Sequence, residues 1–205
     1  MPNGANKSTV EGDAMNDIYR GSLVRLSAAD PEELGKTHPQ WARDTELMRL
    51  FGSGPARVHS ARAGIEYYEK IVKDAPPSHF YFSIRLLAGD RLLGETDLEV
   101  THWAARDAFV GIGIYNRADW GKGYGTDAMK IMLRYAFTEL NLRRVTLSVF
   151  GYNPRAVRSY EKAGFRHEGR LRGALLKDGK RWDMLYMGII FDEWKELNSD
   201  HSTAS

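Results

Sequence analysis

Three glycines stand at positions 121, 123 and 125, in the segment RADWGKGYGTDAMKIM (117–132), directly before a run of good helix formers. The first N–H groups of a helix have no partner within it, and the helix dipole makes that end attractive to anions. Glycines let a phosphate group approach these N–H groups closely. The segment therefore predicts an anion-binding turn, although a tight turn without a ligand would use the same residues.

Two well-known phosphate-binding loops do not match this spacing. A P-loop has the pattern G-x-x-x-x-G-K-[ST], whereas Lys122 directly follows the first glycine. A dinucleotide-binding turn, G-x-G-x-x-G, would need glycine where Thr126 stands. Neither kind of nucleotide-binding protein is therefore indicated.

The segment just before the turn, FVGIGIY (109–115), is predicted as a strand with one bare face. Its apolar side chains at 110, 112 and 114 point to one side, and Gly111 and Gly113 point to the other. Two glycines on one face indicate a close neighbour, either a packed helix or a long thin ligand. A bare strand followed by a phosphate-binding turn suits an extended amide arm joined to a pyrophosphate, which is the shape of coenzyme A.

Strands and helices alternate around these segments. Strands are predicted over 22–26, 79–87, 91–103, 109–115, 143–150, 165–171 and 182–191, and helices from Pro31, over 63–74, from the glycine turn to Leu140, and from Pro154 to Gly164. This order predicts a mixed α/β (α+β) domain around one large sheet.

Length and composition set the remaining bounds. The 205 residues, 42% hydrophobic and 27% charged, suit one globular domain, expected over 18–198 between disordered tails at 1–17 and 199–205. A formal net charge of +2 favours neither a nucleic-acid nor a membrane partner. The absence of cysteine, of a signal peptide and of a long apolar run leads us to expect a cytoplasmic protein.

Two later segments carry a family resemblance. WGKGYGTDAMKIMLRYAFTELNLRRVTLSV (120–149) and GYNPRAVRSYEKAGFRHEG (151–169) resemble the acyl-CoA-binding half of the GNAT superfamily of N-acetyltransferases. NLRRVTL and the pattern N-P-x-A-x-x-x-Y-x-x-x-G-F are similar to the branch of ribosomal-protein N-terminal and spermidine acetyltransferases. The similarity runs from about Gly94 to Met187 and more faintly back to Ser22, through WARDTEL. Trp120 departs from the Gln or Arg that the family often has at its position.

The resemblance implies a fold and a donor site. The GNAT fold has one mostly antiparallel sheet of about seven strands, splayed at the cofactor site and flanked by about four helices. Acetyl-CoA would place its pantetheine arm on the strand at 112–115 and its pyrophosphate on the glycine turn. The implied donor contacts are Ile112, Gly113, Ile114, Tyr115, Gly121, Lys122, Gly123, Tyr124, Gly125, Thr126, Asn153 and Arg155. Lys122 and Arg117 could add charge near the phosphates, although basic residues in exposed loops are ordinarily only solvated, and Arg155 and Arg158 could reach the adenosine 3′-phosphate.

Tyr160 matches the position at which many family members place a tyrosine near the cofactor sulfur. Attack by an amine on a thioester produces a thiolate leaving group, and a phenol with a pKa near 10 can hydrogen-bond to it or protonate it. The resemblance therefore implies a catalytic Tyr160, whereas a purely structural tyrosine would pack its ring beneath the helix.

An acceptor amine must lose a proton before attack, because an alkylamine has a pKa near 10. Glu95, Asp97 and Glu99 share one face of a predicted strand, where they could equally be a solvated edge. Alignment to the polyamine branch through Gly94 favours Asp97 as the base and leaves Glu95 and Glu99 as weaker candidates, with Glu95 assigned to substrate binding. The same resemblance implies an acceptor pocket walled by Trp41, Glu46 and Phe51. The six histidines show no metal-ligand spacing, so no metal is expected.

These observations predict an N-acetyltransferase that moves an acetyl group from acetyl-CoA directly to a primary amine. The amine is a protein N-terminus, a polyamine or another small amine, and the sequence does not choose between them. A homodimer is also left open. The alternative from another class is a non-catalytic module that senses acyl-CoA, and the presence of Tyr160 argues against it.

Overall fold

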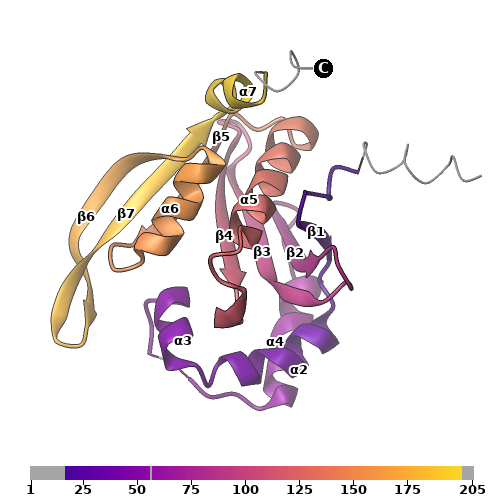
Figure 1. Ribbon diagram of the computed structural model, residues 1–205, viewed down its shortest axis with the longest axis vertical. Helices are drawn as coiled ribbons and strands as arrows, with labels where there is room; N and C mark the ends of the chain where they lie inside the picture. The colour runs from indigo at the N-terminus through magenta and orange to yellow at the C-terminus, as the bar shows by residue number, and fades with distance from the viewer. Residues whose placement is uncertain (1–16, 56, 200–205) are drawn as a thin grey trace, which may run out of the picture.

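A computed structural model describes residues 17–55 and 57–199 (Figure 1). Seven strands form one sheet in the order β1-β2-β3-β4-β5-β7-β6, and all neighbouring pairs are antiparallel except β4 and β5. The strands are β1 (Val24–Ala28), β2 (His79–Leu86), β3 (Leu92–His102), β4 (Asp107–Ile114), β5 (Arg144–Phe150), β6 (Arg166–Lys177) and β7 (Lys180–Ile190). The mixed α/β class and the mostly antiparallel seven-stranded sheet predicted above are confirmed.

Six α-helices accompany the sheet in the described residues, where about four were expected. They are α2 (Pro31–Trp41), α3 (Thr45–Phe51), α4 (Ala61–Lys73), α5 (Tyr124–Arg134), α6 (Pro154–Ala163) and α7 (Phe191–Ser199). A 3-10 turn, η1 (Arg117–Asp119), precedes the glycine turn, and a π turn, η2 (Tyr135–Glu139), extends α5. The sequence prediction missed α3 and α7, and placed the end of the last strand at Phe191, which begins α7.

Helix starts follow the capping residues that the sequence offers. The side chain of Asp30 accepts hydrogen bonds from the N–H groups of Glu32 and Glu33 at the start of α2. Asn153 caps α6 by accepting from the N–H of Ala156, at 3.2 Å, and Pro154 takes the first helical position. Gly164 ends α6 with a φ of +108°, the left-handed conformation predicted for it.

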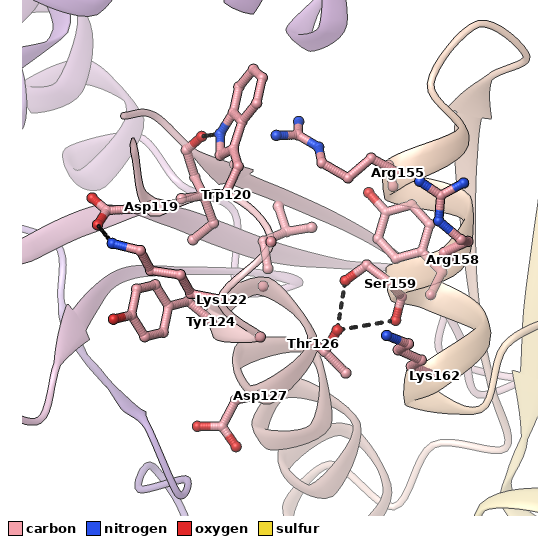
Figure 2. A pocket seen from close by; sticks show the side chains of 18 of the residues that line it. Asp119, Trp120, Lys122, Tyr124, Thr126, Asp127, Arg155, Arg158, Ser159 and Lys162 are labelled. Carbon is pink, nitrogen blue, oxygen red and sulfur yellow. Dashed lines mark hydrogen bonds and ion pairs between the residues drawn. The ribbon is translucent and has the colours of Figure 1, made fainter. Parts of the chain in front are cut away.

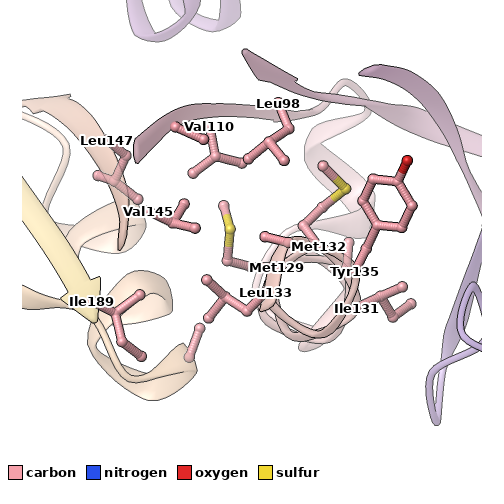
Figure 3. Packing of buried hydrophobic residues seen from close by; sticks show 14 of the residues in the cluster. Leu98, Val110, Met129, Ile131, Met132, Leu133, Tyr135, Val145, Leu147 and Ile189 are labelled. Atoms are coloured by element: carbon pink, nitrogen blue, oxygen red, sulfur yellow. The ribbon is translucent and has the colours of Figure 1, made fainter. Parts of the chain in front are cut away.

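The main core lies between α5 and the middle of the sheet (Figure 3). Met129, Met132 and Leu133 of α5 are almost fully buried. They belong to one apolar cluster with Leu98 of β3, Val110 of β4 and Val145 and Leu147 of β5. This cluster fixes α5, and with it the glycine turn at its N-terminus, against the middle of the sheet.

A separate pair of helices, α2 and α4, packs through two glycines. A Cβ at Gly35 would lie 2.4 Å from Cα of Ile65, and a Cβ at Gly64 would lie 2.6 Å from the carbonyl oxygen of Gly35. The backbones therefore approach more closely than side chains would allow. In Figure 1 these two helices and α3 gather at the end of the sheet opposite α7.

The two predicted tails lie outside the described residues, except for their inner boundary positions Asp17 and Ser199. No described helix combines the length and the apolar character needed to cross a membrane.

Candidate active site

The sheet opens between its two parallel strands. β4 and β5 pair only at Asp107–Phe109 with Arg144–Thr146, and within the described residues no strand pairs with the rest of β4 on that side. The N–H of Tyr115 donates to the carbonyl of Leu93 in β3, so odd-numbered residues of β4 face β3. The backbone groups of Ile112 and Ile114 consequently face the opening, where an extended amide chain could pair with them.

The glycine turn forms one side of this opening. Gly121 has a φ of +75° and Gly123 a φ of +86°, a left-handed conformation that favours glycine. Gly123 is the N-cap of α5 and supplies no side-chain hydrogen bond. The first N–H groups of α5 are therefore available to an anion, as the sequence predicts.

A cavity of about 680 Å³ lies between this turn, β4 and α6 (Figure 2). Its lining includes five basic residues, Lys122, Lys130, Arg155, Arg158 and Lys162. Of its two acidic residues, Asp119 pairs with Arg91 at 2.8 and 2.9 Å, and Asp127 accepts backbone N–H bonds from Ser22, Leu23 and Val24. Asp119 also lies 3.7 Å from Nζ of Lys122, but the basic residues outnumber the acidic ones, so the cavity offers an excess of positive charge to phosphate groups.

Thr126 and Asn153 fasten the elements around this cavity. The hydroxyl of Thr126 lies 2.8 Å from that of Ser159, which joins α5 to α6. Asn153 is 8% exposed and lines the cavity while it caps α6. Both predicted contacts therefore lie at the cavity, and both also have structural roles.

A second cavity, of about 250 Å³, continues into the splay between β4 and β5. The two cavities share the lining residues Leu50, Phe51, Ile112, Gly113, Asn153 and Tyr160. Glu95 and Asp97 line only the second cavity. The donor-sized space and the space beside the carboxylates thus meet at Tyr160.

Tyr160 has a protonated and available hydroxyl. Burial raises the pKa of its phenol to about 12, against the opposing effect of Arg155. Its ring lies 6.1 Å from that of Phe165, and its hydroxyl makes no hydrogen bond to another described residue. Tyr160 can therefore act as a hydrogen-bond donor toward a group at the junction of the cavities.

Glu95 lies in a closed, tyrosine-rich environment. Its Oε2 atom is buried and has no hydrogen-bond partner among the described residues. Burial raises the pKa of its carboxyl, and the hydroxyl groups of Tyr115, Tyr81 and Tyr68 act in the opposite direction. Burial also raises the pKa values of these phenols, so all three stay protonated.

Asp97 is more accessible and already has a partner. Its Oδ2 lies 2.9 Å from Nε2 of His79, and its side chain is 35% exposed. Burial raises the pKa of this carboxyl, and the hydrogen bond with His79 lowers it. Glu99, the third carboxylate of the row, is exposed and lines neither cavity.

The bare face of β4 is covered by side chains. A Cβ at Gly113 would lie 1.6 Å from Cζ of Phe51, and a Cβ at Gly111 would lie 2.4 Å from Oδ1 of Asp97. Of the two explanations that the sequence left open, close packing therefore accounts for these glycines. The coenzyme-sized opening lies along the edge of β4, where both backbone groups of Ile112 and the N–H of Ile114 face it.

Four predicted residues, Trp41, Glu46, Tyr115 and Arg117, lie outside both cavities. Tyr115 is 3% exposed, and its ring stacks on Trp41 with 3.7 Å between ring centroids. Glu46 pairs with Arg117, which also binds Asp44, with 2.8 Å between Nη2 and Oδ1. Trp41 and Tyr115 therefore support the wall behind Glu95, while Arg117 fastens α3 instead of facing phosphates.

Trp120 and Leu50 line the donor cavity although no role was predicted for them. Trp120 was visible in the sequence only as a departure from the family pattern. Leu50 belongs to α3, whose N-cap, Asp44, was the signal in the sequence that could have identified that helix.

Comparisons with known proteins agree with this geometry. A family model described as an acetyltransferase (GNAT) domain matches residues 23–166. The chain is 37% identical to the probable N-acetyltransferase YjcK of Bacillus subtilis (strain 168), over 61% of this chain and 67% of that protein. It is 32% identical to the putative ribosomal N-acetyltransferase YdaF of the same organism, over 54% of this chain and 60% of that protein.

A solved structure shares the whole fold. The spermidine N-acetyltransferase from Vibrio cholerae, in complex with CoA and spermine, superposes with a TM-score of 0.72 and 26% identity, over 84% of this chain and 98% of that one. The chain therefore belongs to the GNAT family of acetyltransferases. It is an acetyl-CoA-dependent N-acetyltransferase.

Acetyl-CoA fits the residues present. Both backbone groups of Ile112 and the N–H of Ile114 face the opening and could pair with its pantetheine arm, and the uncapped start of α5 offers N–H groups to its pyrophosphate. The basic residues of the large cavity match its phosphates in charge.

Proposed function

We propose that this protein transfers the acetyl group of acetyl-CoA directly to a small primary amine that is positively charged in solution. The observation that carries the proposal is the meeting of two cavities at Tyr160, one basic and open to the glycine turn, the other lined by Glu95 and Asp97. Acetyl-CoA supplies a thioester whose carbonyl carbon an amine nitrogen can attack.

The acidic cavity supports the choice of acceptor. Among the described residues that line it none is basic, and its walls are otherwise mostly apolar. Two carboxylates would attract an ammonium group, and the volume of about 250 Å³ suits a small molecule or the end of one. The structural neighbour from Vibrio cholerae, crystallised with spermine, is consistent with such an acceptor.

Glu95 is the proton acceptor that we infer, in place of Asp97. Both carboxylates line the same cavity, but Asp97 is bound to His79, whereas Oε2 of Glu95 has no hydrogen-bond partner among the described residues. The raised pKa of Glu95 moves its basicity closer to that of an amine, which favours proton transfer. Asp97 then holds the ammonium group near Glu95 before its proton is removed.

Tyr160 has the complementary role. Its phenol keeps its proton near neutral pH, because burial raises its pKa to about 12. It can therefore donate a hydrogen bond to the sulfur as the thiolate departs, directly or with proton transfer. Glu95 removes a proton on one side of the junction, and Tyr160 supplies a hydrogen bond on the other.

One experiment tests the proposal. The pure protein is incubated with acetyl-CoA and, separately, spermidine, a monoamine and peptides with free N-termini, while free thiol and acetylated product are measured. We expect thiol release that requires both acetyl-CoA and a small amine. Acetylation of peptide N-termini alone would overturn the choice of acceptor, and binding of acetyl-CoA without transfer to any amine would favour the non-catalytic sensor.

A further inference from the structure

We infer that Trp120 is a platform that holds the guanidinium group of Arg155 ready to bind an oxygen atom of the acetyl donor. The two residues come from opposite sides of the donor cavity, Trp120 from the loop before the glycine turn and Arg155 from the first turn of α6 (Figure 2). This inference concerns only the donor side and rests on the assignment of acetyl-CoA as donor.

The first observation is the stack between the two side chains. Cζ of Arg155 lies 3.2 Å from the centroid of the Trp120 ring. An arginine over the face of a tryptophan is stabilised by the ring quadrupole, by about 0.5–2 kcal/mol depending on desolvation. The flat ring also limits the guanidinium group to one orientation.

The second observation is an unsatisfied donor. Nη1 of Arg155 is buried and has no hydrogen-bond partner among the described residues. Leaving a buried donor unpaired costs about 1–3 kcal/mol, and more for a charged group. Burial also lowers the pKa of this guanidinium group. A ligand oxygen that reaches Nη1 would remove this penalty, so Arg155 is preorganised for binding.

The third observation is the anchoring of Trp120 itself. Its indole N–H donates to the carbonyl oxygen of Ile114, at 2.7 Å, and this carbonyl faces the opening between β4 and β5. The bond ties the platform to the strand along which the donor would lie. It leaves the N–H of Ile114 and both backbone groups of Ile112 for the donor.

These contacts explain the departure at position 120 from the family pattern. Gln or Arg at this position could hydrogen-bond to the donor directly, whereas the N–H of Trp120 is bound to Ile114 and its ring face is stacked on Arg155. In this chain, Arg155 supplies the charge from α6. Trp120 is accordingly a positioning residue, and Arg155 is a residue that binds the donor.

A double-mutant cycle on donor affinity tests this assignment. Calorimetry gives the Kd of CoA for the wild type, Trp120→Leu, Arg155→Met and the double variant. We expect each single substitution to raise Kd roughly ten- to a hundredfold, as for loss of a hydrogen bond to a charged group. Because Trp120 acts through Arg155, the double variant should be little worse than Arg155→Met alone.

Ligand analogues identify the oxygen atom. The comparison uses CoA, dephospho-CoA, which lacks the 3′-phosphate, and pantetheine, which has only the amide arm. If Arg155→Met also raises the Kd of pantetheine, Arg155 donates to an amide carbonyl of the donor. If it raises the Kd of dephospho-CoA but not that of pantetheine, Arg155 binds the pyrophosphate. If it raises only the Kd of CoA, Arg155 binds the 3′-phosphate.

Several controls keep the test decisive. Arg62→Met removes an exposed arginine of α4 that pairs with Glu66, and should leave Kd unchanged. Trp120→Phe keeps an aromatic face and serves if Trp120→Leu does not fold. Unchanged Kd values in folded variants, or losses that multiply in the double variant, would overturn the inference. A wild type that does not bind CoA would instead contradict the assignment of the donor.

Discussion

At the scale of single residues, the three carboxylates of β3 have the same place in the strand pattern but differ in burial and in their partners. Glu95, Asp97 and Glu99 occupy every second position of β3, so they lie on one face of the strand. Glu99 is exposed, Asp97 is bound to His79, and Glu95 is enclosed by tyrosines. The enclosure comes from Tyr68 of α4, Tyr81 of β2 and Tyr115 beyond β4, which are distant in sequence, so a strand pattern alone could not identify Glu95.

Replacing this carboxylate gives the first prediction. Glu95→Gln keeps the shape of the side chain but cannot accept a proton, so kcat at neutral pH should fall roughly 10²–10⁴-fold. Activity should recover partly at high pH, where more of the amine is already neutral. The wild type needs Glu95 ionised, and its raised pKa places the acid limb of kcat/KM above the ordinary value of 4.5.

Asp97→Asn is the matched control for that variant. If Asp97 only attracts the ammonium group, its loss should raise the acceptor KM and leave kcat and the acid limb nearly unchanged. Steady-state rates of both variants between pH 5 and 10 separate these roles. A loss of kcat and of the acid limb in Asp97→Asn, with Glu95→Gln unaffected, would return the role of base to Asp97.

The same glutamate should affect stability, and the sign follows from its pKa. The pKa of Glu95 is higher in the folded state than in the unfolded state, so the folded protein binds this proton more tightly. Its free energy of unfolding therefore falls as pH rises above about 4.5. Glu95→Gln removes this loss, so the variant should be more stable than wild type at pH 7 and similar to it below pH 4. Each kcal/mol would appear as about 2–4 °C in Tm in thermal melts at both pH values.

Tyr160 carries the next residue-scale prediction. Tyr160→Phe removes the phenol that faces the junction of the two cavities, so kcat should fall roughly 10²–10⁴-fold while the Kd of acetyl-CoA changes little. Calorimetry and single-turnover rates measure the two quantities separately. A variant with the kcat of wild type when chemistry limits turnover would leave Tyr160 with a packing role only.

At the scale of secondary-structure elements, the N-terminus of α5 shows what the sequence pattern could and could not reveal. Alternating glycines before a helix predicted an open turn, and the φ values of Gly121 and Gly123 agree with it. The pattern could not show that Gly125 differs from them. It has ordinary helical geometry, and a Cβ there would lie 3.7 Å from Ile114 and Ser159, in normal contact.

Because of this difference, Gly125→Ala tests whether the donor approaches the glycine turn without straining the backbone, as a substitution at Gly123 would. Alanine at position 125 fits the helix and should keep or slightly raise Tm, because alanine favours helix more than glycine does. Its methyl group enters the donor cavity, so the Kd of acetyl-CoA should rise at least severalfold. Unchanged affinity in calorimetry would mean that the donor does not approach this turn.

Helix α3 shows the opposite case, an element that was missed. It has only seven residues, too few for a clear periodic pattern, and its start depends on the cap from Asp44 to the N–H of Leu47. The long-range contacts of Phe51 with Gly113 and of Arg49 with Tyr152 and Asp178 hold it in place. Most residues predicted for the donor line one cavity, because their signals in the sequence are local. The acceptor half depends on contacts between distant segments.

At the scale of the whole molecule, α3 spans the opening of the sheet. On one side, Arg117 after β4 binds Asp44 and Glu46 at the start of α3. On the other side, Tyr152 donates to the carbonyl of Arg49, and Lys177 of β6 donates to that of Gly54. The helix thus links the halves of the splayed sheet, and its Leu50 and Phe51 line both cavities.

Loosening one end of this link provides the last prediction. Arg117→Met removes both ion pairs at the start of α3, and because solvent screens exposed ion pairs, global stability should change little. The local effect should be larger. Amide hydrogen exchange in α3 should accelerate, and the acceptor KM should rise severalfold, because Leu50 and Phe51 would no longer be held over the carboxylates.

Salt provides an independent check on the same contacts. At 1 M salt the screening length falls to about 3 Å, so these exposed ion pairs weaken and the wild type should approach the variant in both exchange rate and KM. Arg62→Met is the matched control, since it breaks an ion pair within α4 that does not involve α3. If α3 exchanges equally slowly in the wild type and in Arg117→Met, the hydrogen bonds to its other end and the contact of Phe51 with Gly113 must hold the helix without Arg117.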